Sequence, residues 1–107
     1  MDALLTRVVS PAPRGLWLRI AENDPRSTVC HAPQWVDALC AFTRWSDASR
    51  YYETEDGRQF VLPLLRRGPR SAAGLRASMP SGWGMGGFVG SADIGSSHVS
   101  AALDDIR

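Results

Sequence analysis

The clearest hydrophobic pattern in the chain is helical and covers "APQWVDALCAFTRW" at residues 32–45. Its apolar positions recur at spacings of about i, i+4 and i+7, which places them on one face of an α-helix. These positions are Trp35, Val36, Leu39, Cys40 and Phe42 or Thr43. Pro33 suits the first helical position, where its missing N–H has no partner to lose. The pattern predicts an amphipathic helix of about three turns.

Two runs with strand-like composition flank an Asp-Gly pair. Residues 50–55 read "RYYETE" and residues 58–66 read "RQFVLPLLR", on either side of Asp56 and Gly57. Asp-Gly favours a two-residue type I′ turn because both positions need a positive φ. We therefore expect a β-hairpin with a two-residue loop. The second strand is apolar from 60 to 65, which predicts that both its faces are covered, while Pro63 predicts an unpaired edge or a bulge.

Weaker patterns predict the elements before the helix. Pro11 and Pro13 break regular structure, so residues 1–13 are expected to form a flexible leader before a domain at 14–107. Residues 15–20, "GLWLRI", alternate between apolar and other side chains, which favours a half-buried strand. A turn cluster, "ENDPR", follows, and "STVCH" at 27–31 favours a short extended piece.

The last third of the chain predicts a strand, a glycine-rich segment and a helix. Residues 75–79, "LRASM", favour a short strand. The helix is expected to begin near Ser96 or Ser97. Its apolar spacing comes from Val99, Ala102, Leu103 and Ile106.

The glycine-rich segment, "PSGWGMGGFVG" at 80–90, raises a question of function because residues 82–87 satisfy G-x-G-x-x-G. A dinucleotide site needs a strand before this pattern and a helix that begins at its last glycines. Here Pro80 spoils the strand and no helix begins at Gly86 or Gly87. Two interpretations stay open, close backbone packing and a substrate-facing wall. The candidate substrate-binding residues are Trp83, Gly84, Met85, Gly86 and Gly87.

Composition restricts the class of protein. The net charge of +1 argues against a general binder of nucleic acid or of membrane surfaces. All 12 basic residues are arginine, which indicates G/C-rich codons and a bacterial source. Neither a signal peptide nor a run of about 20 apolar residues is present, so the cytoplasm is the expected compartment.

Few side chains offer chemistry, and each has an ordinary structural interpretation. Glu53 and Glu55 are expected to share a strand face, where they would more often be solvated opposite Arg58 or Arg66 than act as a base. His31 and His98 lie near predicted helix starts, where capping is the commoner role. A metal set of Cys30, His31, Cys40 and His98 lacks the usual ligand spacing. An arginine group of Arg66, Arg67, Arg70 and Arg76 has the chemistry to bind the phosphates of a nucleotide or a transfer RNA, although such a group is more often a solvated turn. No catalytic residue and no metal site is assigned.

The order of these elements resembles the N-terminal part of a GNAT-superfamily acyltransferase of the Fem/CelD-like branch. Proteins of that branch often open with a "P-x-W" helix, a hairpin of the form "dG-x-x-x-x-lPl-x-rr" and a "P-x-g-x-gG" segment. The matching residues are Pro33, Trp35, Asp56, Gly57, Leu62, Pro63, Leu64, Arg66, Arg67, Pro80, Gly82 and Gly87. The resemblance covers residues 14–105.

The resemblance implies an α+β fold with a mixed, mostly antiparallel sheet and flanking helices. It also implies transfer of an acyl or aminoacyl group to a small-molecule amine, with acetyl-coenzyme A or another acyl-coenzyme A as donor, or an aminoacyl-tRNA. The coenzyme A loop of such enzymes, [RQ]-x-x-G-x-[GA], is not found here, so we expect an N-terminal fragment without its own cofactor site. The alternative is a non-catalytic binding module, monomeric or a homodimer, with residues 60–65 and 83–88 as its interface.

Overall fold

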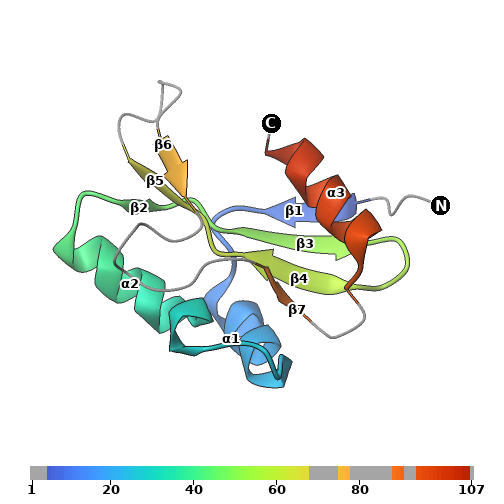
Figure 1. Cartoon of the computed structure of the whole chain (residues 1–107), viewed down its shortest axis with the longest axis horizontal. Coiled ribbons are helices and arrows are strands. Elements are labelled where there is room, and N and C mark those ends of the chain that lie inside the picture. The colour runs from blue at the N-terminus through green and yellow to red at the C-terminus, as the bar shows by residue number, and fades with distance from the viewer. Residues whose placement is uncertain (1–4, 68–74, 78–87, 91–93, 107) are drawn as a thin grey trace.

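The described part of the chain forms three helices and two antiparallel sheets (Figure 1). The computed structural model describes residues 5–67, 75–77, 88–90 and 94–106. The helices are α1 (Arg14–Asn23), α2 (Pro33–Phe42) and α3 (Ser96–Asp105), with a 3₁₀ turn at Val29–His31. The predicted α+β class is confirmed, and every strand pair among the described residues is antiparallel.

The larger sheet has four strands in the order β1-β3-β4-β7. Its strands are β1 (Leu5–Val9), β3 (Arg50–Thr54), β4 (Gln59–Leu62) and β7 (Val89–Gly90). The smaller sheet has the order β2-β5-β6. Its strands are β2 (Ser46–Asp47), β5 (Leu65–Arg67) and β6 (Leu75–Ala77). The strand expected to run through Pro63 is therefore divided at that residue, because proline cannot donate a ladder hydrogen bond.

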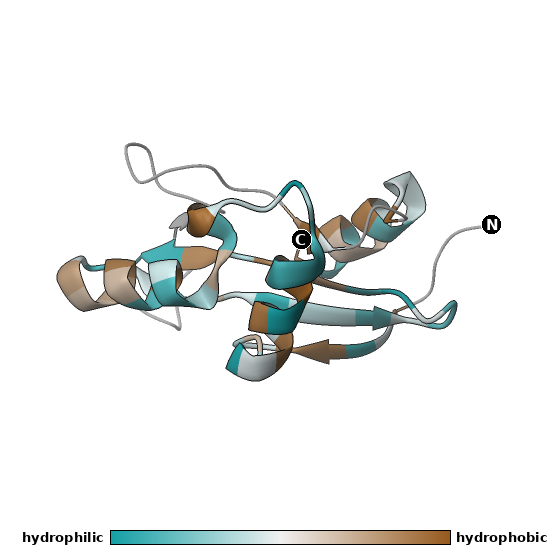
Figure 2. Cartoon of the chain, turned by 90° about the horizontal axis from the view of Figure 1, so that it is seen from below, coloured by the Kyte–Doolittle hydropathy of each residue, from teal (hydrophilic) through white to brown (hydrophobic). Residues whose placement is uncertain are grey.

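Helices cover both faces of the larger sheet. On one face, Tyr51 and Val61 pack with Trp17 of α1 and with Val36 of α2. On the other face, Tyr52 and Phe60 pack with α3, and their rings stack at 5.2 Å. Hydrophobic and hydrophilic residues are interspersed along the helices, as expected for helices that cover a sheet (Figure 2). The prediction that both faces of the second hairpin strand are covered is confirmed: its side chains from 60 to 65 are all buried.

The hairpin is confirmed, but its loop has three residues rather than two. Thr54 and Arg58 form the closing pair, and Gly57 N–H donates to the Thr54 carbonyl at 3.0 Å. Among the described residues only Gly57 has a positive φ, of 83°, so the loop is not the type I′ turn expected of Asp-Gly. It matches the three-residue loop in which a turn is followed by one left-handed glycine.

Residues 15–20 belong to helix α1, so the strand predicted there is wrong. Six residues are too few to separate the two periods, because Leu16 and Ile20 fit both a strand face and an i, i+4 helical pair. The deciding residues lie further along: Trp17, Ala21 and Asp24 are buried together, which follows the helical period. The Trp17 indole also donates to the His31 carbonyl at 2.7 Å, which fixes α1 against the turn before α2.

Two further predictions near the N-terminus need correction. Leu5–Val9, expected in a flexible leader, form strand β1 and pair with β3. Two prolines follow this strand rather than interrupt it, so they do not prevent it. The extended piece expected at 27–31 is the 3₁₀ turn at Val29–His31. The predictions of α2, α3 and the short strand near residue 75 are confirmed.

Candidate functional site

A groove of about 530 Å³ lies between helix α1 and the loop that joins β3 to β4. Its lining residues are Leu16, Arg19, Ile20, Asn23, Gly57, Arg58 and Gln59. Small-molecule sites in proteins have volumes of about 300–1,000 Å³, so the space suits a small ligand. We take this groove as the candidate site.

Helix α1 supplies one wall of the groove through a single face. Leu16, Arg19, Ile20 and Asn23 are spaced i, i+3, i+4 and i+7, which places them in one stripe. Leu16 and Ile20 are partly buried and pack against the core, so they form an aliphatic base. Asn23 donates its side-chain amide to the Arg19 carbonyl at 2.8 Å. The wall therefore combines an apolar floor with a polar rim.

The hairpin supplies the other wall through Gly57, Arg58 and Gln59. The Gln59 amide donates to the Tyr51 hydroxyl at 2.8 Å, and Tyr51 is itself buried. Burial raises the pKa of the Tyr51 hydroxyl, so it stays protonated and neutral at physiological pH. The neutral hydroxyl of the buried Tyr51 therefore holds the Gln59 side chain at the rim of the groove.

The lining residues that the structure describes carry two positive charges and no carboxylate. Among the described residues, no side-chain hydrogen bond or ion pair occupies the exposed guanidinium of Arg19. Asp56, the acidic residue next to Gly57, is engaged elsewhere: its carboxylate accepts from the Thr54 hydroxyl and contacts His98 Nε2 at 3.0 Å. These hydrogen bonds to Thr54 and His98 lower the pKa of Asp56, which keeps it ionised.

His98 joins helix α3 to the hairpin loop. Gly95 N–H donates to His98 Nδ1 at 3.0 Å, so the proton of the neutral ring is on Nε2, which faces Asp56. His31 has the same role in its own turn, where its Nδ1 accepts from Thr28 N–H at 2.9 Å. The capping role predicted for both histidines is confirmed. With both of its ring nitrogens engaged, His98 is not placed to act as a general base.

A second polar contact fixes α3 to the sheet. The Asp105 carboxylate accepts from the Tyr52 hydroxyl at 3.1 Å and from the Arg50 guanidinium at 2.9 Å. Burial, and then the charge of Asp105, raises the pKa of Tyr52 far above its ordinary value. A smaller groove of about 230 Å³ lies beside Arg50 and Asp47. Both side chains are already paired, Arg50 with Asp105 and Asp47 with Arg14, so we do not treat that groove as the site.

Arg14 fixes α1 at the end away from the hairpin. Its guanidinium bridges Asp37 of α2 and Asp47 of β2, each at 2.5 Å, and lies over the Trp17 ring. Partial burial alone would lower the pKa of Arg14, but the two carboxylates outweigh it and raise that pKa. The wall of the groove formed by α1 is thus fixed at both ends, by Arg14 at its start and Asp24 after its last turn.

The residues predicted to touch substrate, Trp83, Gly84, Met85, Gly86 and Gly87, lie outside the described residues. So do Pro80, Gly82 and Arg70. The prediction that Glu53 and Glu55 share a strand face is wrong, because β3 ends at Thr54 and Glu55 is the first loop residue. Glu53 pairs with Arg7 at 3.3 Å rather than with Arg58 or Arg66.

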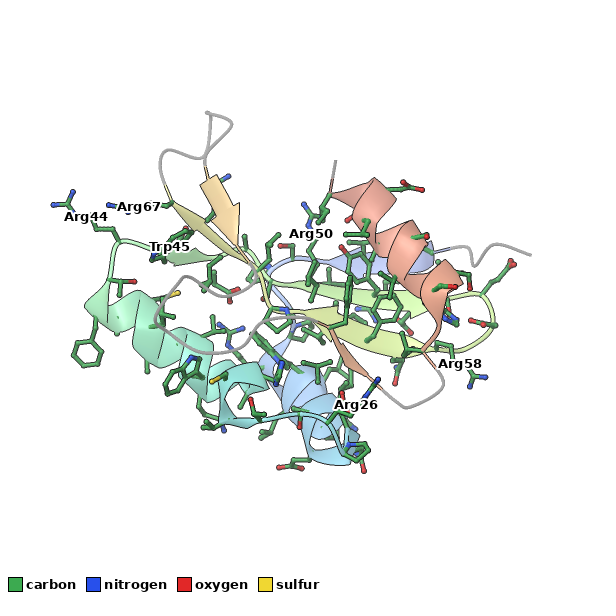
Figure 3. All side chains as sticks on the ribbon, in the orientation of Figure 1. Arg26, Arg44, Trp45, Arg50, Arg58 and Arg67 are labelled. Carbon is green, nitrogen blue, oxygen red and sulfur yellow. The ribbon has the colours of Figure 1, made fainter. Side chains whose placement is uncertain are left out.

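The fold separates the members of the proposed metal set, whereas it places three of the four arginines on the paired strands β5 and β6. His31 and His98 are in separate turns, and no group of three potential metal ligands occurs within the described part of the chain. Burial raises the pKa of the Cys40 thiol, so it is held as a neutral thiol. Of the arginine group, Arg66 and Arg67 lie on β5 and Arg76 lies opposite Arg66 on β6. Figure 3 shows Arg67 at the end of the molecule opposite Arg58.

Sequence reasoning missed the groove because it assigned the wrong period to α1. As a strand, residues 15–20 place Arg19 on the face opposite Leu16 and Ile20. As a helix, the same residues bring all three to one wall. The i, i+4 recurrence of Leu16–Ile20 and Trp17–Ala21 was the available signal.

No described helix is both long and apolar enough to cross a membrane. No protein-family model, curated protein or solved structure matches this chain.

Proposed function

We propose that this chain forms the N-terminal part of an N-acyltransferase and provides the surface that receives the acceptor amine. The reaction joins an acyl or aminoacyl group to a primary amine. Coenzyme A thioesters and aminoacyl-tRNA are the donor classes, and both occur in the cytoplasm, which we take as the compartment. The observation that carries the proposal is the open groove of about 530 Å³ beside the hairpin that bears the Fem/CelD-like residues.

The residues shared with the Fem/CelD-like pattern occupy turning points of the fold, which supports the proposal. Pro33 is the first residue of α2, Gly57 is the left-handed residue of the hairpin loop, and Pro63 separates β4 from β5. Each is a position where backbone geometry restricts the residue type. A shared backbone arrangement would place the same residue types at these positions, and this supports the proposal.

The chemistry of the groove suits binding rather than the transfer step. Acyl transfer to an amine needs a base for the amine proton and hydrogen-bond donors for the developing oxyanion. The described part of the lining offers donors, in Arg19, Arg58 and the two amides, but neither a carboxylate nor an imidazole. We therefore assign acceptor binding to this chain, and the base to another part of the working enzyme.

The described residues do not fit a coenzyme A site. A pyrophosphate needs unpaired backbone N–H groups at a glycine-rich turn before a helix. Gly95, the described glycine just before α3, donates its N–H to His98 Nδ1 instead. In the proposed enzyme the thioester is bound elsewhere, and this chain orients the amine.

The test is amide formation with two donors. Purified chain is incubated with a panel of primary amines and either acetyl-coenzyme A or aminoacyl-tRNA, with and without the polypeptide encoded immediately downstream. Amide product is followed by mass spectrometry. We expect amide only when the downstream polypeptide is present. If neither donor yields amide in its presence, the proposal fails; amide formed by this chain alone overturns the division of labour.

A second candidate function, a non-catalytic binding module, is favoured by one surface feature. Phe42 at the end of α2 is 84% exposed, and with Trp35, Ala38 and Leu39 it lines a small apolar hollow. The interface predicted at residues 60–65 is wrong, because those residues are buried in the core of this chain. Light scattering of wild type and Phe42→Ser tests whether this hollow is a homodimer interface: a dimer lost in the variant supports that role, and a monomer in both contradicts it.

A further inference from the structure

The α1–hairpin groove has the composition of a site for an amphiphilic oxyanion. We propose that it binds a small molecule with a carboxylate or phosphate group next to an aliphatic segment. This inference rests on the proposed function in one respect only, the identity of the ligand. Under the proposed function the ligand is the acceptor amine, and that amine also carries a carboxylate or phosphate group, which is the end that enters the groove.

The charge of the lining selects an anion. Arg19 and Arg58 approach the groove from opposite walls, one on α1 and one on the hairpin. Guanidinium groups bind carboxylates and phosphates through two parallel N–H donors, which gives both strength and direction. With two guanidinium groups and no carboxylate among the described lining residues, this part of the groove repels an ammonium group and attracts an oxyanion.

The acidic side chains next to the groove residues, Asp56 and Asp24, do not neutralise Arg19. Asp56, next to the groove glycine, is bound to Thr54 and His98. Asp24, just past the groove residue Asn23, is buried and accepts from the backbone N–H of Gly90 at 3.0 Å. Each is occupied by a contact that stabilises the fold, so neither is placed to neutralise Arg19.

The floor of the groove selects an aliphatic segment. Leu16 and Ile20 are one helical turn apart and partly buried, which leaves an apolar strip of about 6 Å along the helix. An alkyl chain of four to six carbons covers about this length. The amides of Asn23 and Gln59 border the strip and supply donors to an oxygen at its edge.

Gly57 keeps the hairpin side of the groove open. An added Cβ there has no atom within 4 Å, so it would project into free space. The positive φ of 83° at this position disfavours any residue with a side chain. The same glycine therefore satisfies the backbone of the loop and leaves the groove open to a ligand.

The experiment compares ligands that differ in one end group. Hexanoate, hexyl phosphate, 6-aminohexanoate and hexylamine are titrated into the intact chain by calorimetry, at fixed ionic strength. We expect the first three to bind at least tenfold more tightly than hexylamine. The ratio of hexanoate to hexyl phosphate affinity identifies the preferred oxyanion. Equal binding of hexylamine and hexanoate, or no binding of any oxyanion, overturns the proposal.

Matched arginine variants locate the site. Arg19→Gln should weaken hexanoate binding about tenfold, Arg19→Lys should retain part of the affinity, and Arg44→Gln should leave it unchanged. Arg44 is exposed and lies at the far end of the molecule from Arg58 (Figure 3). Equal losses in Arg19→Gln and Arg44→Gln would show attraction to net charge alone and overturn the proposal. Binding by this chain, with no amide formed even when the downstream polypeptide is present, would refute the proposed function while leaving the groove assignment intact.

Discussion

The substitution Asp24→Ala tests how α1 is fixed to the sheet, because Asp24 links the two. Its side chain is only 2% exposed, although it carries a charge. One carboxylate oxygen accepts from Arg26 N–H at 2.9 Å, within its own turn. The other accepts from Gly90 N–H at 3.0 Å, on strand β7. The carboxylate therefore connects the end of the groove helix with the edge of the four-stranded sheet.

The expected loss of stability follows from which donors are left without a partner. Gly90 is buried, so its N–H loses its partner without access to water, at a cost of about 1–3 kcal/mol. Arg26 is exposed and its N–H can be hydrated, which adds about 0.5 kcal/mol. The ion pair with Arg26 adds little, because that side chain is 68% exposed and 3.7 Å away. We expect Asp24→Ala to lower the free energy of unfolding by about 2 kcal/mol.

Urea unfolding followed by tryptophan fluorescence and by circular dichroism measures this change. Asp24→Asn keeps one acceptor oxygen, so its loss should be about half that of Asp24→Ala. Arg26→Ala serves as the matched control and should change stability by less than about 0.5 kcal/mol. The reasoning is refuted if Asp24→Ala is as stable as the wild type, or if Arg26→Ala costs as much.

Three further predictions concern the hairpin and its neighbours. Gly57→Ala should cost about 1–2 kcal/mol from backbone strain alone, because φ is 83° and nothing crowds an added Cβ. Gly90→Ala should cost about 1–3 kcal/mol by overpacking, since its Cβ would lie 3.0 Å from that of Phe60. The folded state lowers the pKa of Asp56, so its contribution to stability is present above about pH 4 and is lost as the pH falls through the lowered pKa. The gap in stability between wild type and Asp56→Asn should therefore narrow in acid.

Each of these predictions has a control in the same chain. Gly15→Ala, within the first turn of α1, has open space and no positive φ, so it should be neutral or stabilising by about 0.5 kcal/mol. A loss there equal to that of Gly57→Ala would contradict the backbone argument, and an unchanged Gly90→Ala would contradict the packing argument. For Asp56, a gap that stays constant from pH 7 to pH 3 in urea titrations would show that its carboxylate does not stabilise the fold.

Elements could be predicted from the sequence where a long periodic pattern coincides with a second signal, such as a proline or a turn residue at the end of the element. Helix α2 has a wide apolar stripe and a proline at its first position, and the hairpin has two strand-like runs around a glycine turn. The loop type was not predictable from Asp56-Gly57 alone, because the extra loop residue depends on the register Glu53↔Gln59. Strand β1 was missed because its partner, β3, is distant in the chain.

The candidate site could not be predicted, for a related reason. Its lining comes from two segments about 40 residues apart, and neither carries a recognised ligand-binding motif. Arg19 cannot be recognised as a binding residue from the sequence alone. Its role follows only from the fold, which places Leu16 and Ile20 on the same helical face and the hairpin loop opposite them. The glycine-rich segment was predicted to contact substrate because its combination of residue types is rare. A rare composition does not determine where a segment packs.

The most direct test of the groove is a map of where an oxyanion binds. Amide signals of the ¹⁵N-labelled chain are recorded by nuclear magnetic resonance during titration with 6-aminohexanoate. We predict saturable shifts that concentrate at residues 16–23 and 57–59, and that are absent in Arg19→Gln. Shifts spread over Arg44, Arg67 and other exposed arginines, or none at α1 and the hairpin loop, would contradict the account.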